Sequence, residues 1–400
     1  MDFNSKPSNV MHIDLNSCFA TVEQQANPFL RGKPIAVAAY DSPRGCILAP
    51  SVEAKKLGIK VGMRVFEGRA IYPKLIVKTP DPDKYRDIHK RLHGLLADYT
   101  DEITPKSIDE FVLDLTGRDL WEIAREIKTR IKKEIGDYLT VSVGIAPNRF
   151  LAKTAAGLHK PDGLDEINVS NFLEIYSKLK LTDLCGIKAG NAGRLNSWGI
   201  FTVMDFFNAS ATTLQRAFRS VVGRDWYLRL HGYEADLPVG RQVIRSSFGN
   251  SFALPKPLST PEELAPILAK LVEKTGFRMR QAGFLARGVH VGVLFKDHSY
   301  WHHGMVVSPV FDSRDIFKIA FKILSSCPKR DPVHILSESC FNLEEISNRQ
   351  LEMFSGRKEE LVLAMDKINA RWGSFTIAPG LMLGTENFVL DRIAFGGIKV

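Results

Sequence analysis

The fold of this chain is decided by residues 106–114, which read Lys-Ser-Ile-Asp-Glu-Phe-Val-Leu-Asp. Two adjacent carboxylates, Asp109 and Glu110, stand immediately before an apolar run that predicts a strand. A third carboxylate, Asp14, lies near the end of the segment 10–15, which also predicts a strand. Because carboxylates from separate strands can assemble a two-metal site, these residues predict an enzyme that transfers nucleotidyl groups.

The adjacency of Asp109 and Glu110 places a condition on the backbone. Consecutive residues of a regular strand point to opposite faces, so both can reach one centre only at a hairpin turn or bulge. Residues 103–106, Ile-Thr-Pro-Lys, supply the expected break. Three close carboxylates repel one another unless cations lie among them, and Mg²⁺ suits an all-oxygen site. The alternative is that all three are ordinary acids at strand ends.

Three motifs in order resemble the Y-family, or translesion, DNA polymerases, which include the polymerase IV and polymerase V types. The motifs are residues 12–23 (HIDLNSCFATVE), 107–110 (SIDE) and 143–153 (VGIAPNRFLAK). The resemblance runs from about Met11 to Phe354. Three motifs in the right order are more specific than any one short pattern.

The resemblance implies that Asp14, Asp109 and Glu110 bind two Mg²⁺ ions, with the Leu15 carbonyl as a further ligand. In such a site, with the ions about 3.5 to 4 Å apart, one ion lowers the pKa of the primer 3′-hydroxyl and the other holds the triphosphate. The reaction implied is addition of a deoxynucleotide to primer-template DNA.

Two further residues match the nucleotide contacts of the family. Phe19 matches a steric gate, an aromatic ring under the sugar that excludes a 2′-hydroxyl. Lys160 matches the lysine that neutralises the triphosphate. Without the resemblance, Phe19 would be read as helix packing and Lys160 as a loop lysine.

The match departs from the family pattern at three positions. Val52 and Lys55 stand where most members have a tyrosine and an arginine that contact the phosphates. Lys55 keeps the positive charge of the arginine but lacks its planar guanidinium group. Arg44 is a candidate to supply the missing phosphate contact. Asn16 stands where many relatives have a second aspartate, and by strand alternation we leave it out of the site.

The order of expected elements fits a ferredoxin-like sheet with helices on one face, and the resemblance implies an α/β (α+β) right-hand polymerase in which this sheet is the palm. The palm elements are strands 11–15, 110–115 and 139–146 with helices 19–25 and 120–134. The expected domains are a palm (1–31 and 81–168), small fingers (32–80), a helical thumb (169–238), a little finger (241–345) and a tail (346–400).

The thumb and the little finger are the expected DNA-binding parts. Gly186, Lys188 and Gly190 lie in a sequence resembling a helix-hairpin-helix, where backbone amides approach a phosphate. An ordinary helical turn is the alternative. The little finger is expected to be a mixed α/β domain, a sheet with helices at about 261–281 and 313–324.

Composition agrees with a polyanionic partner. The formal net charge is +9, and residues 241–330 hold fourteen Lys and Arg against six Asp and Glu. A domain that grips DNA is the favoured explanation, and a basic solvated surface is the alternative. His298, His302 and His303 lack nearby cysteines or acids at metal-binding spacing, so a polar sheet edge is expected.

Several classes are disfavoured by what the sequence contains. The five cysteines show no metal-binding spacing, which indicates a reducing compartment, so we expect a cytoplasmic protein. No apolar run approaches the length of a membrane span, so we expect no membrane partner. We also expect a monomer. No phosphate-loop or dinucleotide glycine fingerprint is present.

Near the end, residues 350–354 resemble the peptide that binds the sliding clamp, with Gln350, Leu351, Met353 and Phe354 as the contact residues. An inward-packed helix N-terminus is the alternative. The sequence as a whole predicts an error-prone translesion DNA polymerase without proofreading, recruited by the clamp. A non-catalytic DNA- and clamp-binding relative and a palm-fold nucleotidyl cyclase stay open as alternatives.

Overall fold

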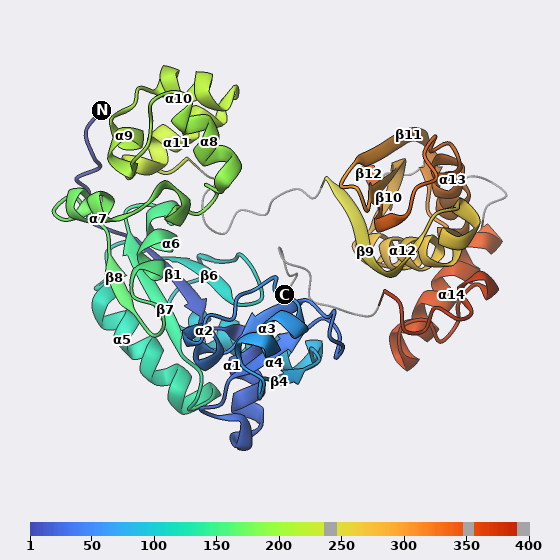
Figure 1. The fold of residues 1–400 in the computed structure, drawn as a ribbon, viewed down its shortest axis with the longest axis horizontal. Coiled ribbons are helices and arrows are strands. Elements are labelled where there is room, and N and C mark those ends of the chain that lie inside the picture. Colours follow the sequence, from blue (N-terminus) through green and yellow to red (C-terminus); the bar gives the residue numbers. More distant parts are fainter. Residues whose placement is uncertain (236–245, 347–355, 390–400) are drawn as a thin grey trace. The chain divides into compact units, whose positions relative to one another are not determined.

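A computed structural model describes residues 1–235, 246–346 and 356–389 of the chain (Figure 1). These residues form two compact units, one on each side of the segment 236–245. Each unit contains a β-sheet with packed helices, which agrees with the predicted α/β class. None of the helices that the structure describes is both long and apolar enough to cross a bilayer.

The first unit is built on a five-stranded sheet that carries the predicted palm strands. Its order is β5 (Ile103–Pro105), β6 (Glu110–Asp114), β1 (Val10–Leu15), β7 (Val141–Ala146) and β8 (Leu164–Glu166). Strand β1 runs antiparallel to both β6 and β7, while β7 and β8 are parallel. The alternate residues Met11, Ile13 and Leu15 are buried in one core. His12 and Asp14 therefore face the other side of the sheet.

The two predicted helices lie on one face of this sheet, as expected, and a further helix that was not predicted covers the other face. The core on one face is formed with α1 (Cys18–Ala26), α4 (Pro82–Ala97) and α5 (Leu120–Arg130). Helix α6 (Arg149–Leu158) packs on the other face. Its close approach requires Gly144, because a Cβ there would lie 2.0 Å from the Ala152 carbonyl oxygen. The predicted helix 120–134 continues past α5 as a single π-helical segment, Ile131–Ile135.

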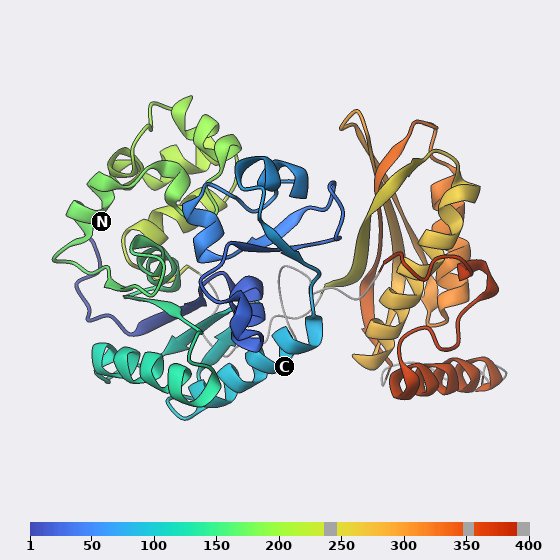
Figure 2. The same ribbon diagram turned by 60° about the horizontal axis from the view of Figure 1, so that its bottom comes forward.

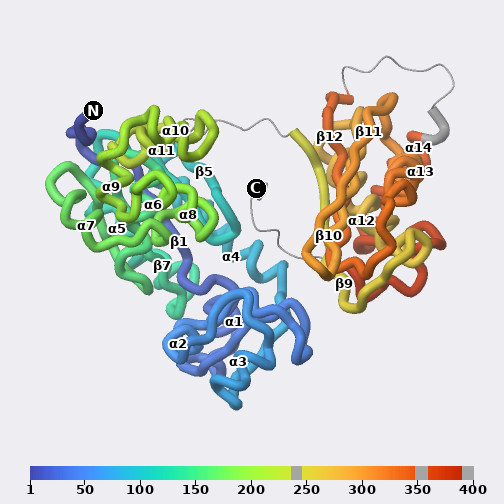
Figure 3. Tube along the Cα trace, turned by 45° about the horizontal axis from the view of Figure 1, so that its top comes forward, coloured from blue at the N-terminus to red at the C-terminus, as the bar shows by residue number. Residues whose placement is uncertain are grey.

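The range predicted as fingers, traced in shades of blue in Figure 3, contains a smaller sheet. Its strands are β3 (Ile47–Pro50), β2 (Ile35–Ala38) and β4 (Ile76–Lys78), in that order, with helices α2 (Val52–Lys56) and α3 (Val65–Ile71). They enclose a small core of their own, which includes Ile47, Ile59 and Val65.

The range predicted as thumb is helical. It contains α7 (Phe172–Lys178), the 3-10 helix η3 (Leu181–Asp183), α8 (Ala189–Asn196), α9 (Val203–Asn208), α10 (Ala211–Phe218) and α11 (Val222–Leu230). These helices share one hydrophobic core with α6. Phe3 of the N-terminal segment stacks on Phe172 with ring centroids 4.1 Å apart, which fixes this segment to the helices.

The second unit is an antiparallel sheet with two helices on one face (Figure 2). The sheet order is β11 (Tyr300–Val310), β10 (Phe284–Phe295), β12 (Val333–Glu345) and β9 (Ser247–Leu258). The helices are α12 (Pro261–Gln281) and α13 (Ser313–Ser325), within one residue of their predicted bounds.

The part of the tail that the structure describes, residues 356–389, also belongs to this second unit. It comprises α14 (Gly356–Trp372), the 3-10 helix η5 (Gly380–Met382) and the residues that follow to 389. Asp366 of α14 accepts two hydrogen bonds from the buried Arg280 of α12, at 2.6 and 2.9 Å. Residues 356–389 are therefore part of the packed unit.

Candidate active site

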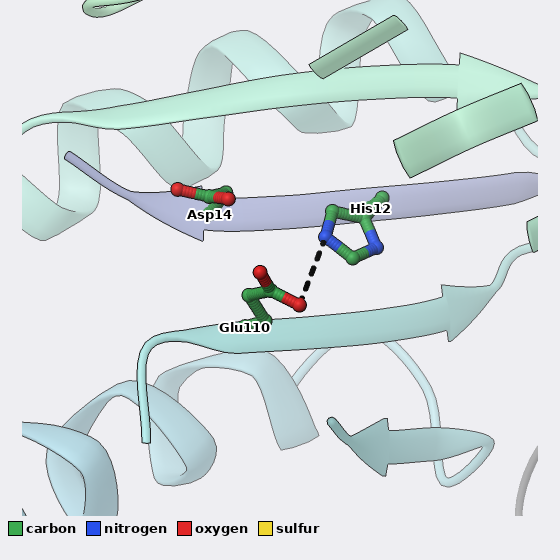
Figure 4. A group of neighbouring side chains, drawn as sticks. All are labelled: His12, Asp14 and Glu110. Atoms are coloured by element: carbon green, nitrogen blue, oxygen red, sulfur yellow. Dashed lines mark ion pairs between the residues drawn. The ribbon is translucent and has the colours of Figure 1, made fainter. Parts of the chain in front are cut away.

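Asp14 and Glu110 face each other across neighbouring strands. The antiparallel register of β1 and β6 places Asp14 directly opposite Glu110, and such partners share one face of a sheet. Their side chains are only 15% and 19% exposed. Figure 4 shows them beside His12, whose Nε2 lies 3.8 Å from Oε2 of Glu110. Potential ligand atoms of these three residues all lie within 4.8 Å of one another.

Asp109 reaches the same region from irregular backbone, as predicted. Residues 106–109 form the turn between β5 and β6, closed by a 2.9 Å hydrogen bond from the Lys106 amide to the Glu110 carbonyl. The Leu15 amide donates to the Asp109 carbonyl at 2.9 Å, which joins this turn to the end of β1. The Ser107 hydroxyl donates to the Asp109 carboxylate at 2.5 Å. Asp109 thus lines the adjoining cavity but does not belong to the tight group around His12.

Burial makes the negative charges of this region costly. It raises the pKa of Asp14 and of Asp109, and the neighbouring carboxylates raise both further. The charge of Lys160 opposes this effect on both carboxyl groups, and a second lysine lies beside Glu110. Lys160 Nζ lies 2.6 Å from Asp14 Oδ2, and Lys153 Nζ lies 2.6 Å from Glu110 Oε2. The carboxylates are therefore held among cationic groups.

The sequence predicted Lys160 but missed both Lys153 and His12. Lys153 lies on α6, so its approach to Glu110 depends on the packing of that helix against the sheet. His12 is two residues before Asp14, and its shared strand face is the signal that could have found it. Burial and nearby lysines lower the pKa of His12 to about 3, so its imidazole is neutral.

A cavity of about 580 Å³ adjoins the carboxylates. It is lined by Asp14, Leu15, Asp109, Phe19, Lys160, Val52 and Lys55, among others. The Phe19 ring stacks on Tyr85, with centroids 4.5 Å apart and planes 12° apart, so one wall is stiff. Burial and the charge of Lys160 lower the pKa of Lys55. Arg44 is exposed and is not among the described residues that line the cavity.

The residues present fit a divalent cation that prefers oxygen ligands. Asp14, Asp109 and Glu110 offer carboxylate oxygens from the ends of two adjacent strands, and Leu15 lines the same cavity. Without a cation, the partly buried carboxylates of Asp14 and Glu110 are balanced by the ammonium groups of Lys160 and Lys153. A divalent ion would add the positive charge that three close acids require.

The predicted hairpin in the helical region forms a turn between η3 and α8. Gly186 has a left-handed backbone, with φ 92°, and a Cβ there would lie 3.2 Å from the Trp226 ring. Lys188 is the N-cap residue of α8, and both Lys188 and Gly190 are exposed. The element before the turn is a short 3-10 helix in place of an α-helix.

The basic residues of the second unit gather largely on its helical side. Helices α12 and α13 carry Lys270, Lys274, Arg278, Arg280, Arg314, Lys318 and Lys322. Several are neutralised, since Arg280 pairs with Asp366, Arg314 with Asp312 and Lys318 with Asp315. Their charge alone therefore does not mark a DNA-binding face.

The three histidines considered in the sequence, His298, His302 and His303, lie on or next to the edge strand β11, as predicted. His302 and His303 are exposed residues of β11, and His302 Nδ1 lies 3.1 Å from His290 Nε2. No group of three potential metal ligands in the described residues includes them. The predicted clamp peptide, 350–354, lies outside the described residues.

Comparison with known families gives two matches. Residues 13–157 match the impB/mucB/samB family, and residues 245–353 match its C-terminal domain. The chain is 31% identical over 391 residues to DNA polymerase IV 1 of Bacillus subtilis, covering 94% of each chain. It is 30% identical to DNA polymerase IV of Pelotomaculum thermopropionicum, covering 96% of this chain and 97% of that one.

Solved structures agree with the sequence relatives. A Y-family DNA polymerase chimera of Dbh and Dpo4 superposes with a TM-score of 0.74 and 27% identity, covering 84% of this chain and 98% of that chain. An insertion ternary complex of Dbh DNA polymerase gives a TM-score of 0.56 at 26% identity, with the same coverage.

Proposed function

Because this chain belongs to the Y family of DNA polymerases and is a DNA-directed DNA polymerase, we propose that it adds deoxynucleotides at the cavity beside Asp14, Asp109 and Glu110. The observation that carries this proposal is the register of β1 and β6, which pairs Asp14 with Glu110 on one face. The turn at 106–109 brings Asp109 to the same cavity.

In this proposal, Asp14, Asp109, Glu110 and the Leu15 carbonyl hold two Mg²⁺ ions. When bound, such ions activate a hydroxyl nucleophile and neutralise the charge on the phosphates. The protein supplies the position of the reacting groups, and positioning with charge neutralisation accounts for most of the rate of such transfers. The Asp14 and Glu110 carboxylates are only partly exposed, so little water surrounds this charge.

The cavity also contains the groups that would bind the nucleotide. We propose that the Phe19 ring, held by Tyr85, excludes a 2′-hydroxyl. Lys160 and Lys55 line the same cavity and would neutralise the triphosphate, whereas Val52 offers no hydrogen bond. Since Arg44 does not line the cavity, its phosphate contact stays a prediction.

The remaining assignments concern DNA and partners. We propose that the five-stranded sheet is the palm, the three-stranded sheet the fingers, the helical region the thumb and the second unit the little finger. The exposed Gly186 turn and Lys188 would contact a DNA phosphate. The peptide 350–354 would recruit a monomeric enzyme to the sliding clamp, and synthesis would be error-prone and without proofreading.

The metal assignment is tested by single-nucleotide addition with a nucleotide whose α-phosphate carries sulfur at one non-bridging position. Sulfur binds Mg²⁺ poorly and softer ions well, so addition should slow in Mg²⁺ and recover when Mn²⁺ or Cd²⁺ is added. A Glu110→Gln variant should need more Mg²⁺ for half-maximal rate. Equal rates for the oxygen and sulfur nucleotides, with no recovery, would contradict direct contact between the ions and the phosphate.

A further inference from the structure

The turn at residues 160–163 presents Lys160 to the active-site cavity. Lys160 is 41% exposed at its side chain, yet its Nζ lies 2.6 Å from Asp14 Oδ2. Asp162, two residues later, has a left-handed backbone with φ 61°. Aspartate adopts this conformation more readily than most residues other than glycine, and contacts from neighbouring elements hold the turn in place.

One set of contacts comes from Asn16, which is 4% exposed and also lines the cavity. Its Oδ1 accepts a 2.8 Å hydrogen bond from the Asp162 amide and one of 3.2 Å from the Thr140 hydroxyl. Its Nδ2 donates to Ser142 Oγ at 2.8 Å. Ser142 Oγ in turn accepts from the Gly163 amide at 3.4 Å. Asn16 and Ser142 therefore bind two consecutive amides of the turn.

A second set of contacts holds the turn from α5 and the π-helical segment. Lys128 Nζ donates to the carbonyls of Asp162 and Gly163 at 2.5 and 3.1 Å, and it pairs with the Asp162 carboxylate at 2.9 Å. Lys132 pairs with the same carboxylate at 3.1 Å. These lysines contact the carbonyl groups of the turn and the Asp162 carboxylate. Among the described residues, only the side chains of Asn16 and Ser142 accept hydrogen bonds from the amides of the turn.

The backbone of Asn16 is itself fixed. Its amide donates to the Thr140 carbonyl at 2.9 Å, and its carbonyl accepts from the Thr21 hydroxyl at 2.6 Å. Asn16 follows directly on β1, which carries Asp14, so it couples the metal-binding strand to the turn that carries Lys160. A shift of this turn would change the distance between Lys160 and Asp14.

We propose that Asn16 is a positioning residue, whose amide group fixes the 160–163 turn and so places the Lys160 ammonium where it meets the nucleotide triphosphate. The proposal rests on the proposed function of Lys160 as the triphosphate contact. The Oδ1 atom of Asn16 accepts from Asp162 and Thr140, and its Nδ2 donates to Ser142, so we assign Asn16 to holding the turn and not to direct contact with the nucleotide.

The test is a double-mutant cycle of Asn16→Leu and Lys160→Ala in the full chain, with KM for the correct deoxynucleotide and kcat as readouts. Lys160→Ala should raise KM about tenfold or more, since it removes a charge-assisted contact. Asn16→Leu should raise KM about tenfold with a smaller change in kcat. In the Lys160→Ala background, Asn16→Leu should change KM less than about twofold, because coupled residues do not act additively.

Two milder variants keep the test informative if Asn16→Leu does not fold. Asn16→Asp can accept from the Asp162 amide and from both hydroxyls, so its KM should stay within about threefold of the native value. Ser142→Ala loses one amide contact and should raise KM about threefold, again only when Lys160 is present. A matched control is Asn148→Leu, since Asn148 is also buried with three hydrogen bonds, far along the chain at the α6 N-cap.

The outcomes separate this proposal from the one on which it rests. Unchanged KM in Lys160→Ala would refute the triphosphate role of Lys160 and the positioning role with it. A raised KM in Lys160→Ala with a normal KM in Asn16→Leu and Ser142→Ala would refute the positioning role alone. If Asn16→Leu raised KM by the same factor with and without Lys160, as we expect for Asn148→Leu, the positioning role of Asn16 would also be refuted. Such independent effects would indicate that the substitution disturbs the packing of the protein in general.

Discussion

Replacement of Phe19 by alanine removes the ring that forms one wall of the cavity proposed to bind the nucleotide. Phe19 is 7% exposed and stacks on Tyr85, which is itself buried on α4. The ring therefore cannot swing away from an added 2′-hydroxyl without disturbing the core beneath it. A ribonucleotide in the native cavity would meet this stiff wall, whereas in Phe19→Ala it would find open space.

The size of the effect follows from the packing. Forcing an extra group into a well-packed site costs about 1 to 3 kcal/mol, and each 1.4 kcal/mol corresponds to about tenfold. Phe19→Ala should therefore raise the ratio of kcat/KM for ribonucleotide to deoxynucleotide by about five- to 150-fold. The same truncation should lower the free energy of unfolding by about 3 kcal/mol, at the lower end for a buried phenylalanine.

The assay is single-nucleotide addition to a primed DNA template, with the matched deoxynucleotide and ribonucleotide compared for each variant. Leu92→Ala is the control, since Leu92 is 1% exposed in the same core but is not among the described residues lining the cavity. It should lose stability and keep its sugar selectivity. Unchanged selectivity in Phe19→Ala, or an equal change in Leu92→Ala, would refute the gate.

Three further predictions concern other parts of the chain. Lys153→Met should lower the Mg²⁺ concentration for half-maximal rate severalfold, because Lys153 Nζ, 2.6 Å from Glu110, competes with the ion for that carboxylate; an increased Mg²⁺ requirement in the titration would contradict this. Burial raises the pKa of Glu338 in the second unit to about 7 from an ordinary 4.5, so the native state binds more protons and stability should fall by about 3 kcal/mol as pH rises from 4.5 to 7. In Glu338→Gln the free energy of unfolding should change less with pH. It is measured by urea unfolding of the full chain, followed by fluorine NMR of fluorotryptophan at Trp301, and an unaltered dependence on pH would contradict the prediction. Deletion of residues 350–354 should abolish stimulation by the sliding clamp and spare basal synthesis in primer extension, and equal loss of both would show that the segment is structural.

The strands and the turn of the site follow from local sequence. Apolar runs predicted β1 and β6. The prediction of a break at residues 103–106 was wrong for 103–105, which form strand β5, and the irregular backbone that brings Asp109 to this region is the turn 106–109. The Phe19 and Lys160 positions came from motif resemblance, and both line the cavity. Their chemical roles stay predictions.

The contacts that the sequence did not predict depend on tertiary packing. Asn16 was left out on the ground of strand alternation, but that rule puts residues two apart, such as Asp14 and Asn16, on the same face, so it was misapplied. In addition, β1 ends at Leu15 and Ser17 has a left-handed backbone with φ 51°. Alternation therefore no longer decides where Asn16 points. Lys153 meets Glu110 only because α6 packs on the second face of the sheet, where the small Gly144 admits it.

Primer extension on a primed DNA template with Mg²⁺ and all four deoxynucleotides tests the central claim most directly. The native chain is compared with Asp109→Ala/Glu110→Ala, and binding of both proteins to the same DNA is measured in parallel. We predict synthesis by the native chain and none by the double variant, with similar DNA affinity. Undiminished synthesis by the double variant would contradict the assignment of these carboxylates as the catalytic centre.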